Sequence, residues 1–297
     1  MIKALGTTAA ALLVAGALVP TTATAASTAN CALGAGSVTS GGDHRSVLAI
    51  ATTPPTARED IVAADVYAPG QVRVSASMNE LDDGFGGVNV FGYVIIGDGL
   101  YASGYHAVNG THDGAPAARI GGGWGSFVAL EEADYQGSAD THITRRNTYG
   151  LRSDGTLFRW TLINGDWRNR ASAPGFAAVK SMALISKSRT YDTFLANTRG
   201  GALYTIHIPT TAPMKPVVKL VRAKTWQGFE ALLAQKCGLY GTLLLGIDRD
   251  TGSGYLYAVG RANGTATVIQ SLGKVPATLA DPVDFRWKDP GAPLNGE

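Results

Sequence analysis

Residues that could do acid–base or metal chemistry gather at two places in this chain. Residues 79–84 read Asn-Glu-Leu-Asp-Asp-Gly, and residues 248–252 read Asp-Arg-Asp-Thr-Gly. The first segment could offer the two carboxylates, about 5–10 Å apart, that glycoside hydrolysis requires. The second places the oxygens of Asp248 and Asp250 at alternate positions, as some calcium loops do, but it lacks the later glutamate of an EF-hand loop. Both segments are also typical of solvated turns, so weak calcium binding at Asp248 and Asp250 stays open.

Motifs for nucleophilic, zinc or phosphate chemistry are absent from the sequence. It contains no Gly-x-Ser-x-Gly elbow and no His-Glu-x-x-His helix, and its one Gly-Lys pair, at 273–274, lacks the spacing of a phosphate-binding loop. The histidines are scattered along the chain, at His44, His106, His112, His142 and His207. We therefore expect no catalytic residue, no bound metal and no cofactor.

Aromatic side chains are the remaining candidates for ligand contact, because sugars stack their C–H faces on indole and phenol rings. Trp167 lies in a polar turn, Asn-Gly-Asp-Trp-Arg-Asn, where core packing is not expected. Trp124 and Trp226 could instead be either ligand contacts or core residues wedged between sheets. The candidate ligand contacts are Tyr101, Trp124, Phe127, Trp167, Tyr204, Trp226 and Phe229.

The elements that would position these side chains are indicated by two recurring patterns. An aliphatic–aromatic pair occurs at 66–67, 100–101, 157–158, 203–204 and 256–257, with a mean step near 48 residues. The second pattern is an aromatic residue followed by apolar residues three and six positions later, and it starts at Phe85, Trp124, Phe176 and Trp226. A degenerate fifth copy would start at Val275. Short alternating strands and turns such as Asn-Gly separate these markers. Residues 228–236 could be a short helix or an extended segment.

A repeat of this length, holding about four short strands, predicts one blade of a β-propeller. The chain is therefore predicted to be all-β, a five-bladed β-propeller over residues 43–287, with a strand around 47–51 completing the last blade. Two sandwich domains are the alternative. They would explain alternating strands but not the recurrence of two linked patterns.

Residues 1–25 have the features of a secretory signal peptide. Lys3 precedes the apolar stretch 4–19, and Ala23-Thr24-Ala25 supplies small residues for cleavage. No later segment is long enough to span a membrane, although an uncleaved anchor is the alternative for the leader. In an exported protein Cys31 and Cys237 are predicted to form a disulfide. Residues 26–42 would be a flexible entry tail, and residues 288–297 a C-terminal tail.

The charge balance limits the partners. Of 297 residues only 16 % are charged, and the formal net charge is +2. Binding to nucleic acid or to a membrane surface needs a concentrated basic face, so neither partner is expected. We expect a secreted monomer of bacterial character, in which the Asn-Gly-Thr sequons at Asn109 and Asn263 stay unmodified.

One segment resembles a known family. Gly121-Gly-Gly-Trp124-Gly-Ser-Phe127 is similar to the Gly-Trp-x-x-Phe motif of the tachylectin-type five-bladed β-propeller lectins, and residues 99–102 and 254–259 resemble the other half of that family's blade. The likeness covers roughly residues 45–287, with Phe176 in place of Trp and Val179 in place of Phe. Known members bind N-acetylated amino sugars in pockets between neighbouring blades. The resemblance therefore implies non-catalytic binding of extracellular glycans; the sugar and the number of working pockets stay open.

Two other classes of function also stay open. A secreted hydrolase or lyase acting on polysaccharide at the central channel would need acids or histidines clustered at equivalent strand starts. A protein-binding scaffold would need a contiguous apolar or charged patch on one face.

Overall fold

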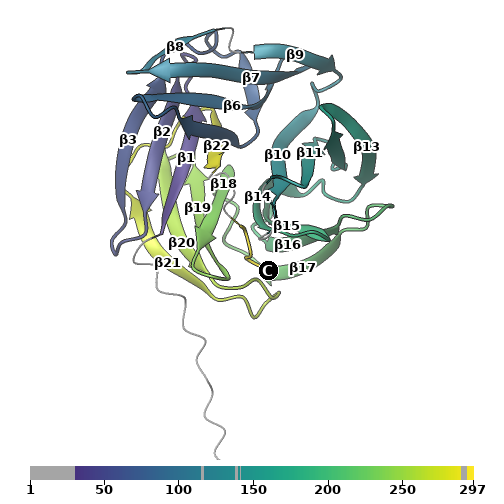
Figure 1. Ribbon diagram of the computed structural model, residues 1–297. Coiled ribbons are helices and arrows are strands. Elements are labelled where there is room, and N and C mark those ends of the chain that lie inside the picture. Colours follow the sequence, from purple (N-terminus) through teal and green to yellow (C-terminus); the bar gives the residue numbers. More distant parts are fainter. Residues whose placement is uncertain (1–30, 115–116, 138–139, 141, 289–292) are drawn as a thin grey trace, which may run out of the picture.

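The computed structural model describes residues 31–114, 117–137, 140, 142–288 and 293–297 (Figure 1). The predicted signal peptide 1–25 lies outside this range. All regular structure within it is β-strand, as predicted for an all-β chain. In the described part of the chain no helix could cross a bilayer.

Three sheets have four antiparallel strands each, in chain order. The first contains β10 (Phe127–Tyr135), β11 (Arg145–Arg152), β12 (Leu157–Ile163) and β13 (Asp166–Ala173). The second contains β14 (Val179–Lys187), β15 (Tyr191–Thr198), β16 (Leu203–Pro209) and β17 (Val217–Arg222). The third contains β18 (Ala231–Cys237), β19 (Gly241–Asp248), β20 (Ser253–Val259) and β21 (Ile269–Val275).

The remaining strands form one ten-stranded sheet with two halves. One half is β3 (Thr56–Ala63), β2 (His44–Ile50), β1 (Ala32–Val38) and β22 (Val283–Lys288). The other is β4 (Val72–Ser75), β5 (Met78–Asp82), β6 (Gly87–Ile96), β7 (Gly99–Val108), β8 (Thr111–Asp113) and β9 (Ala117–Gly122). Among the described residues, the halves are joined by the parallel pairing of Trp287 with Met78 and Lys288 with Asn79, and by an isolated bridge between Ala63 and Gly110.

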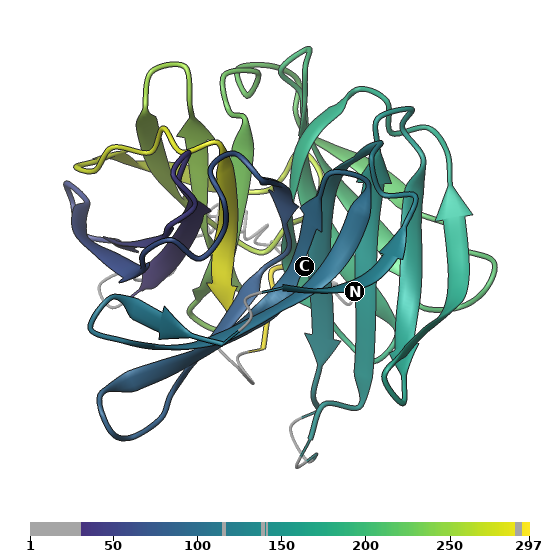
Figure 2. The same cartoon turned by 90° about the horizontal axis from the view of Figure 1, so that it is seen from above.

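The sheets stand around a common centre (Figure 1). The innermost strands are β4, β10, β14, β18 and β22, and each contacts the next in a closed sequence. Figure 2 shows the same sheets from another side, with the blue and teal strands of the β5–β8 region extending away from the body. Antiparallel sheets arranged radially about a channel are the architecture of a β-propeller. Two sandwiches would not give this closed sequence.

One backbone hydrogen bond recurs before every innermost strand. The N–H groups of Tyr67, Trp124, Phe176, Trp226 and Leu279 donate, at 2.9–3.0 Å, to the carbonyls of Gly42, Asp98, Gly155, Gly201 and Gly252. Each donor residue is buried, and each acceptor lies in a hairpin of the preceding sheet. A buried aromatic residue, or leucine in the last copy, therefore anchors one sheet onto its neighbour.

The recurring pattern in the sequence predicts the anchor residue correctly in three of the five copies, at Trp124, Phe176 and Trp226. In the other two copies it predicts the wrong residue. Phe85 is 95 % exposed in the turn between β5 and β6, and Val275 ends β21. Tyr67 and Leu279 hold the anchor positions instead. The anchor needs a buried apolar side chain and one N–H, and leucine supplies both, so a search for aromatic residues could not find the last copy.

The expected boundaries also need correction. Residues 26–42 were expected to be a flexible entry tail, but 32–38 form β1, which pairs with β2 and β22 because Leu33 and Ala35 are apolar and buried. The strand expected at 47–51 lies within β2. The C-terminal tail, expected from 288, is packed where it is described: Leu294 is buried and Gly296 N–H donates to Ile185. Residues 231–236 are extended within β18.

The core lies between neighbouring sheets, in clusters that each draw on two of them. A disulfide joins Cys31 and Cys237, as predicted, with Cα atoms 5.4 Å apart. Cys31 directly precedes β1, and Cys237 ends β18. The covalent bond therefore connects two adjacent sheets across a cluster that contains Leu33 and Leu233.

Candidate functional site

Three of the predicted ligand contacts meet in one aromatic cluster between β6 and the β10–β13 sheet. The ring centroids of Trp124 lie 4.5 Å from Phe127 and 4.9 Å from Trp160, and those of Trp167 and Tyr93 lie 5.1 Å apart. Trp124 is 8 % exposed and Phe127 is 5 % exposed. Both rings therefore pack against neighbouring aromatic rings, whereas Trp167 is only half-buried. Their role in ligand contact stays a prediction.

The other predicted contacts lie elsewhere. Trp226 and Phe229 are buried together with Tyr257, whose ring centroid is 5.0 Å from that of Trp226. Tyr101 on β7 and Tyr204 on β16 are half-buried and belong to neither cluster. The structure thus places the seven residues in four separate locations.

A pocket of about 350 Å³ opens beside the first cluster, and we call it the Tyr93 pocket. It lies between β5–β7 on one side and β10–β11 on the other. Its lining residues are Asn79, Leu81, Phe91, Gly92, Tyr93, Ala102, Ser103, Glu132, Asp134, Ile143 and Arg146.

Strand alternation produces the apolar wall of this pocket. Asn79 and Leu81 alternate on β5, and Phe91 and Tyr93 alternate on β6, so all four face the same side of the sheet. Asn79 pairs with Phe91 across the strands, and Tyr93 pairs with Ala102. Leu81 and Phe91 are 39 % and 43 % exposed. The pocket therefore presents an uncovered phenyl ring next to a half-buried phenol.

Tyr93 is held in place from behind. Its ring meets that of Trp167 edge-on, at 78° between the ring planes. Burial raises the pKa of Tyr93, and the nearby charge of Glu132 adds to the rise. The ring is therefore packed against an aromatic neighbour, and the phenol stays protonated at neutral pH.

The polar side of the pocket contains ion-paired side chains as well as polar atoms without a hydrogen-bond partner. Lys288 Nζ lies 2.8 Å from Glu132 and 3.1 Å from Asp134. Burial raises the pKa of Glu132, and the charge of Lys288 opposes that rise. The Oδ1 atom of Asp134 is buried and accepts no hydrogen bond. The exposed side chain of Arg146 makes no hydrogen bond or ion pair with the described residues. Its guanidinium is thus available to a ligand, and the unbonded Asp134 Oδ1 lies buried in the pocket wall.

The acidic turn at 79–84 does not form the carboxylate pair considered from the sequence. Asp82 and Asp83 accept the backbone N–H groups of Gly84 and Phe85, and Asp83 lies 2.8 Å from His106 Nε2. Glu80 faces the other side of β5, into a pocket of about 540 Å³ that it shares with Asp60. Burial and then the charge of Asp60 raise the pKa of Glu80.

The other acidic and histidine residues considered from the sequence contact neighbouring protein groups. Asp248 accepts the backbone N–H of Thr251 at 3.1 Å in its turn. Among the described residues, no group of three or more His, Cys, Asp or Glu side chains could hold a metal ion. Buried His44 contacts Tyr105, and His207 pairs with Glu297 at 2.5 Å.

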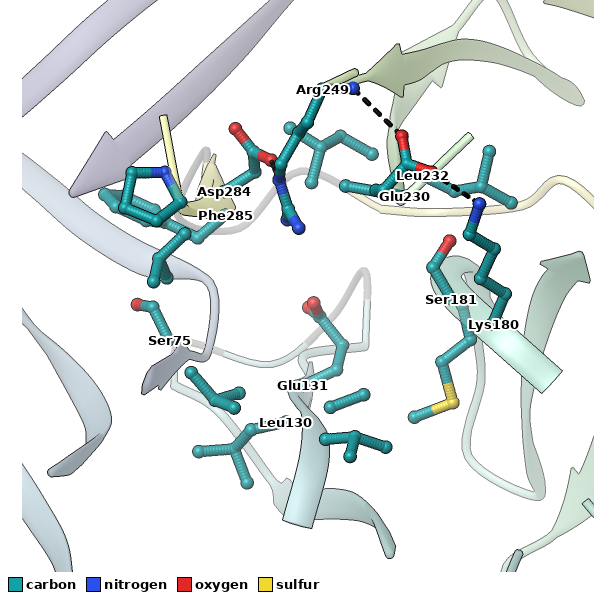
Figure 3. Close-up of a pocket in the computed structure, with 18 of the residues that line it drawn as sticks. Ser75, Leu130, Glu131, Lys180, Ser181, Glu230, Leu232, Arg249, Asp284 and Phe285 are labelled. Atoms are coloured by element: carbon teal, nitrogen blue, oxygen red, sulfur yellow. Dashed lines mark hydrogen bonds and ion pairs between the residues drawn. The ribbon is translucent and has the colours of Figure 1, made fainter. Parts of the chain in front are cut away.

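The central channel is a third cavity, of about 370 Å³, lined by all the innermost strands (Figure 3). Its acids come from different strands but each is held by a cation. Glu230 pairs with Lys180, Asp284 Oδ2 lies 2.7 Å from Arg249 Nε, and Glu131 lies 3.1 Å from Arg286. Burial raises the pKa of Asp284 to about 6, although Arg249 opposes the rise. A hydrolase needs a free acid and a free base, and these carboxylates are instead neutralised by ion pairs.

Sequence reasoning missed the residues that form the Tyr93 pocket. Phe91 and Tyr93 lie in a segment expected to be a short strand, but neither they nor Arg146 were among the candidate ligand contacts. The signal available was the alternation of Phe91, Tyr93 and Ile95 in an extended run, which places two aromatic rings on one face. Arg146 comes from another sheet, and no local pattern indicates that contact.

Comparison with known proteins gives only weak similarities. No protein-family model matches the chain, and no curated protein matches it. Among solved structures, the six-bladed β-propeller fungal lectin of Aleuria aurantia, with a fucose recognition mode, is 13 % identical, covers 88 % of this chain and 81 % of its own, and has a TM-score of 0.43. A mutant of AofleA from Arthrobotrys oligospora is 10 % identical, with coverages of 80 % and 84 % and a TM-score of 0.42. The catalytic domain of a GH62 α-L-arabinofuranosidase from Coprinopsis cinerea is 14 % identical, with coverages of 76 % and 71 % and a TM-score of 0.39.

Proposed function

We propose that this chain is a secreted, monomeric, five-bladed β-propeller that binds carbohydrate without catalysis, and that the Tyr93 pocket is one of its binding sites. The observation that carries the proposal is the composition of this pocket. An exposed Phe91 and a fixed Tyr93 stand opposite an unpaired Arg146 and a buried, unpaired oxygen of Asp134. Counting each half of the ten-stranded sheet as one blade supports the number five.

A sugar ring needs this combination of surfaces. Its C–H face gains from contact with aromatic rings, and its hydroxyls need charged or planar partners to replace water. Phe91 and Tyr93 supply the first surface, while Arg146 donates and Asp134 accepts. The pocket volume of about 350 Å³ is in the range of small-molecule sites. N-acetylated amino sugars remain the proposed ligand class: Asn79 Nδ2 donates to the carbonyl of Phe91 at 3.2 Å, which leaves Asn79 Oδ1 to accept the N–H of an acetamido group.

The proposal is tested by a glycan array on the mature protein, followed by calorimetric titration of the best ligand. Arg146→Ala removes an exposed side chain without a protein partner, so folding should be unchanged. We expect affinity to fall by at least about tenfold, because a charge-assisted hydrogen bond is lost. Phe91→Ala should weaken binding similarly. The matched control is Arg58→Ala, which removes an exposed arginine on β3 outside every cavity described above.

Two outcomes would contradict the proposal. The first is a folded protein that binds no sugar on the array. The second is equal binding by the Arg146→Ala variant and the wild type, which would move the site away from this pocket. Secretion is tested separately: the N-terminal residue of the exported protein should follow Ala25, and the disulfide is compatible with an extracellular location.

A further inference from the structure

The central channel contains two arginines that form no ion pair with a described carboxylate. Arg73 on β4 donates to the carbonyl of Gly97 at 2.9 Å, and Arg199, in the turn after β15, donates to the carbonyl of Ala177 at 2.6 Å. Both line the channel cavity, and both are exposed. The charge of Arg73 helps to lower the pKa of nearby Asp98, but their side chains form no ion pair. Two guanidinium groups without an ion-pair partner therefore line this cavity.

A third arginine presents free donors at the centre of the channel. Arg249 uses Nε for its bond to Asp284, and its terminal amino groups have no partner among the described residues. Figure 3 shows this guanidinium pointing into the open centre of the cavity, on the opposite side from Glu131. The terminal amino groups form the planar fork that matches a carboxylate.

The other charged groups facing the channel are already paired. Lys180 neutralises Glu230, and Arg286 neutralises Glu131. Asp284 is 2 % exposed and is held by Arg249. The cavity is thus electrically positive although it contains three carboxylates, and the serine hydroxyls of Ser75 and Ser181 line it beside Leu130 and Leu232.

We infer that the channel is a second ligand site, separate from the Tyr93 pocket, that takes the carboxylate of an acidic sugar. The carboxylate lies against Arg249, and Arg73 and Arg199 attract it to the mouth. The serine hydroxyls accept hydrogen bonds from the sugar ring, and a volume of about 370 Å³ accommodates a ligand of this size. The inference does not depend on sugar binding at the Tyr93 pocket.

The test uses calorimetric titration of the mature protein with sodium glucuronate, methyl glucoside and sodium sulfate. Glucuronate should bind more tightly than both, and its affinity should fall as sodium chloride is raised. The double variant Arg73→Gln/Arg199→Gln should bind glucuronate at least about tenfold more weakly. The matched control, Arg58→Gln/Arg119→Gln, loses the same net charge from exposed positions outside the channel and should bind like the wild type.

The outcomes that overturn the inference are distinct from those above. Equal losses in the two double variants would mean non-specific attraction by net charge. Sulfate binding as tight as glucuronate binding would mean a simple anion site without sugar recognition. If the channel variant does not fold, the wild type decides. The inference is then wrong when the wild type does not bind glucuronate, or when salt does not weaken that binding. Failure of the Arg146→Ala experiment leaves the channel site unaffected.

Discussion

Replacement of Trp124 by alanine distinguishes the two roles that its position allows, core packing and ligand contact. The indole is 8 % exposed, its backbone N–H anchors it to Asp98 at 3.0 Å, and its ring contacts Phe127 and Trp160. A buried tryptophan removes roughly 150–250 Å² from water, which at about 25 cal/mol/Å² stabilises the fold by about 4–6 kcal/mol as an upper limit. Partial collapse of the cavity reduces this value. We therefore expect Trp124→Ala to lower the free energy of unfolding by about 4 kcal/mol.

The assay is urea unfolding followed by circular dichroism, with thermal unfolding as a second readout. For a domain of this size, 4 kcal/mol corresponds to a fall in melting temperature of roughly 8–16 °C. Phe85→Ala is the control, because this aromatic ring is 95 % exposed and its loss should cost less than about 0.5 kcal/mol. A loss below about 1 kcal/mol in Trp124→Ala, together with abolished sugar binding, would refute the packing role and make Trp124 a ligand contact.

Two further predictions concern the disulfide and the buried acid. Replacing Cys31 and Cys237 by alanine frees a loop of 206 residues, and loop entropy predicts a loss of up to about 5 kcal/mol in urea unfolding; a loss below about 1 kcal/mol would contradict this. Burial raises the pKa of Asp284 from 3.8 to about 6, so the folded protein holds this proton more tightly than the unfolded chain, and stability falls as the pH rises from about 4 to about 6. Asp284→Asn should remove up to about 3 kcal/mol of that pH dependence, measured by urea unfolding across this range, and an unchanged slope would disprove the reasoning.

The repeat, the sheet class and the disulfide could be predicted from the sequence because each leaves a local or countable mark. Trp124 and Trp226 recur with a buried partner three residues later, and a chain with two cysteines can form only one intramolecular disulfide. The pocket could not be predicted, because its walls come from different sheets. Tyr93 on β6 and Arg146 on β11 line one pocket only once the two sheets have packed together, and their sequence separation carries no periodic signal.

The same limit applies to charge. The sequence shows a nearly neutral chain, whereas the fold concentrates Arg73, Arg199 and Arg249 in one cavity and buries their acidic neighbours in ion pairs. Glu131, Glu230 and Asp284 lie far apart along the chain, so neither an acidic nor a basic cluster is visible before folding. Net charge therefore describes the whole surface and says little about a cavity formed by five strands.

The sheet that combines β22 with β1–β3 has a consequence for biosynthesis. Val38 pairs with Val283, so the first strands to leave the ribosome lack their inner neighbour until nearly the whole chain has been translated. Until then β1 presents an open edge, which other nascent chains can pair with. Productive folding of this protein therefore depends on keeping that edge protected until β22 has been synthesised, and a translational pause before residue 283 would prolong the vulnerable interval.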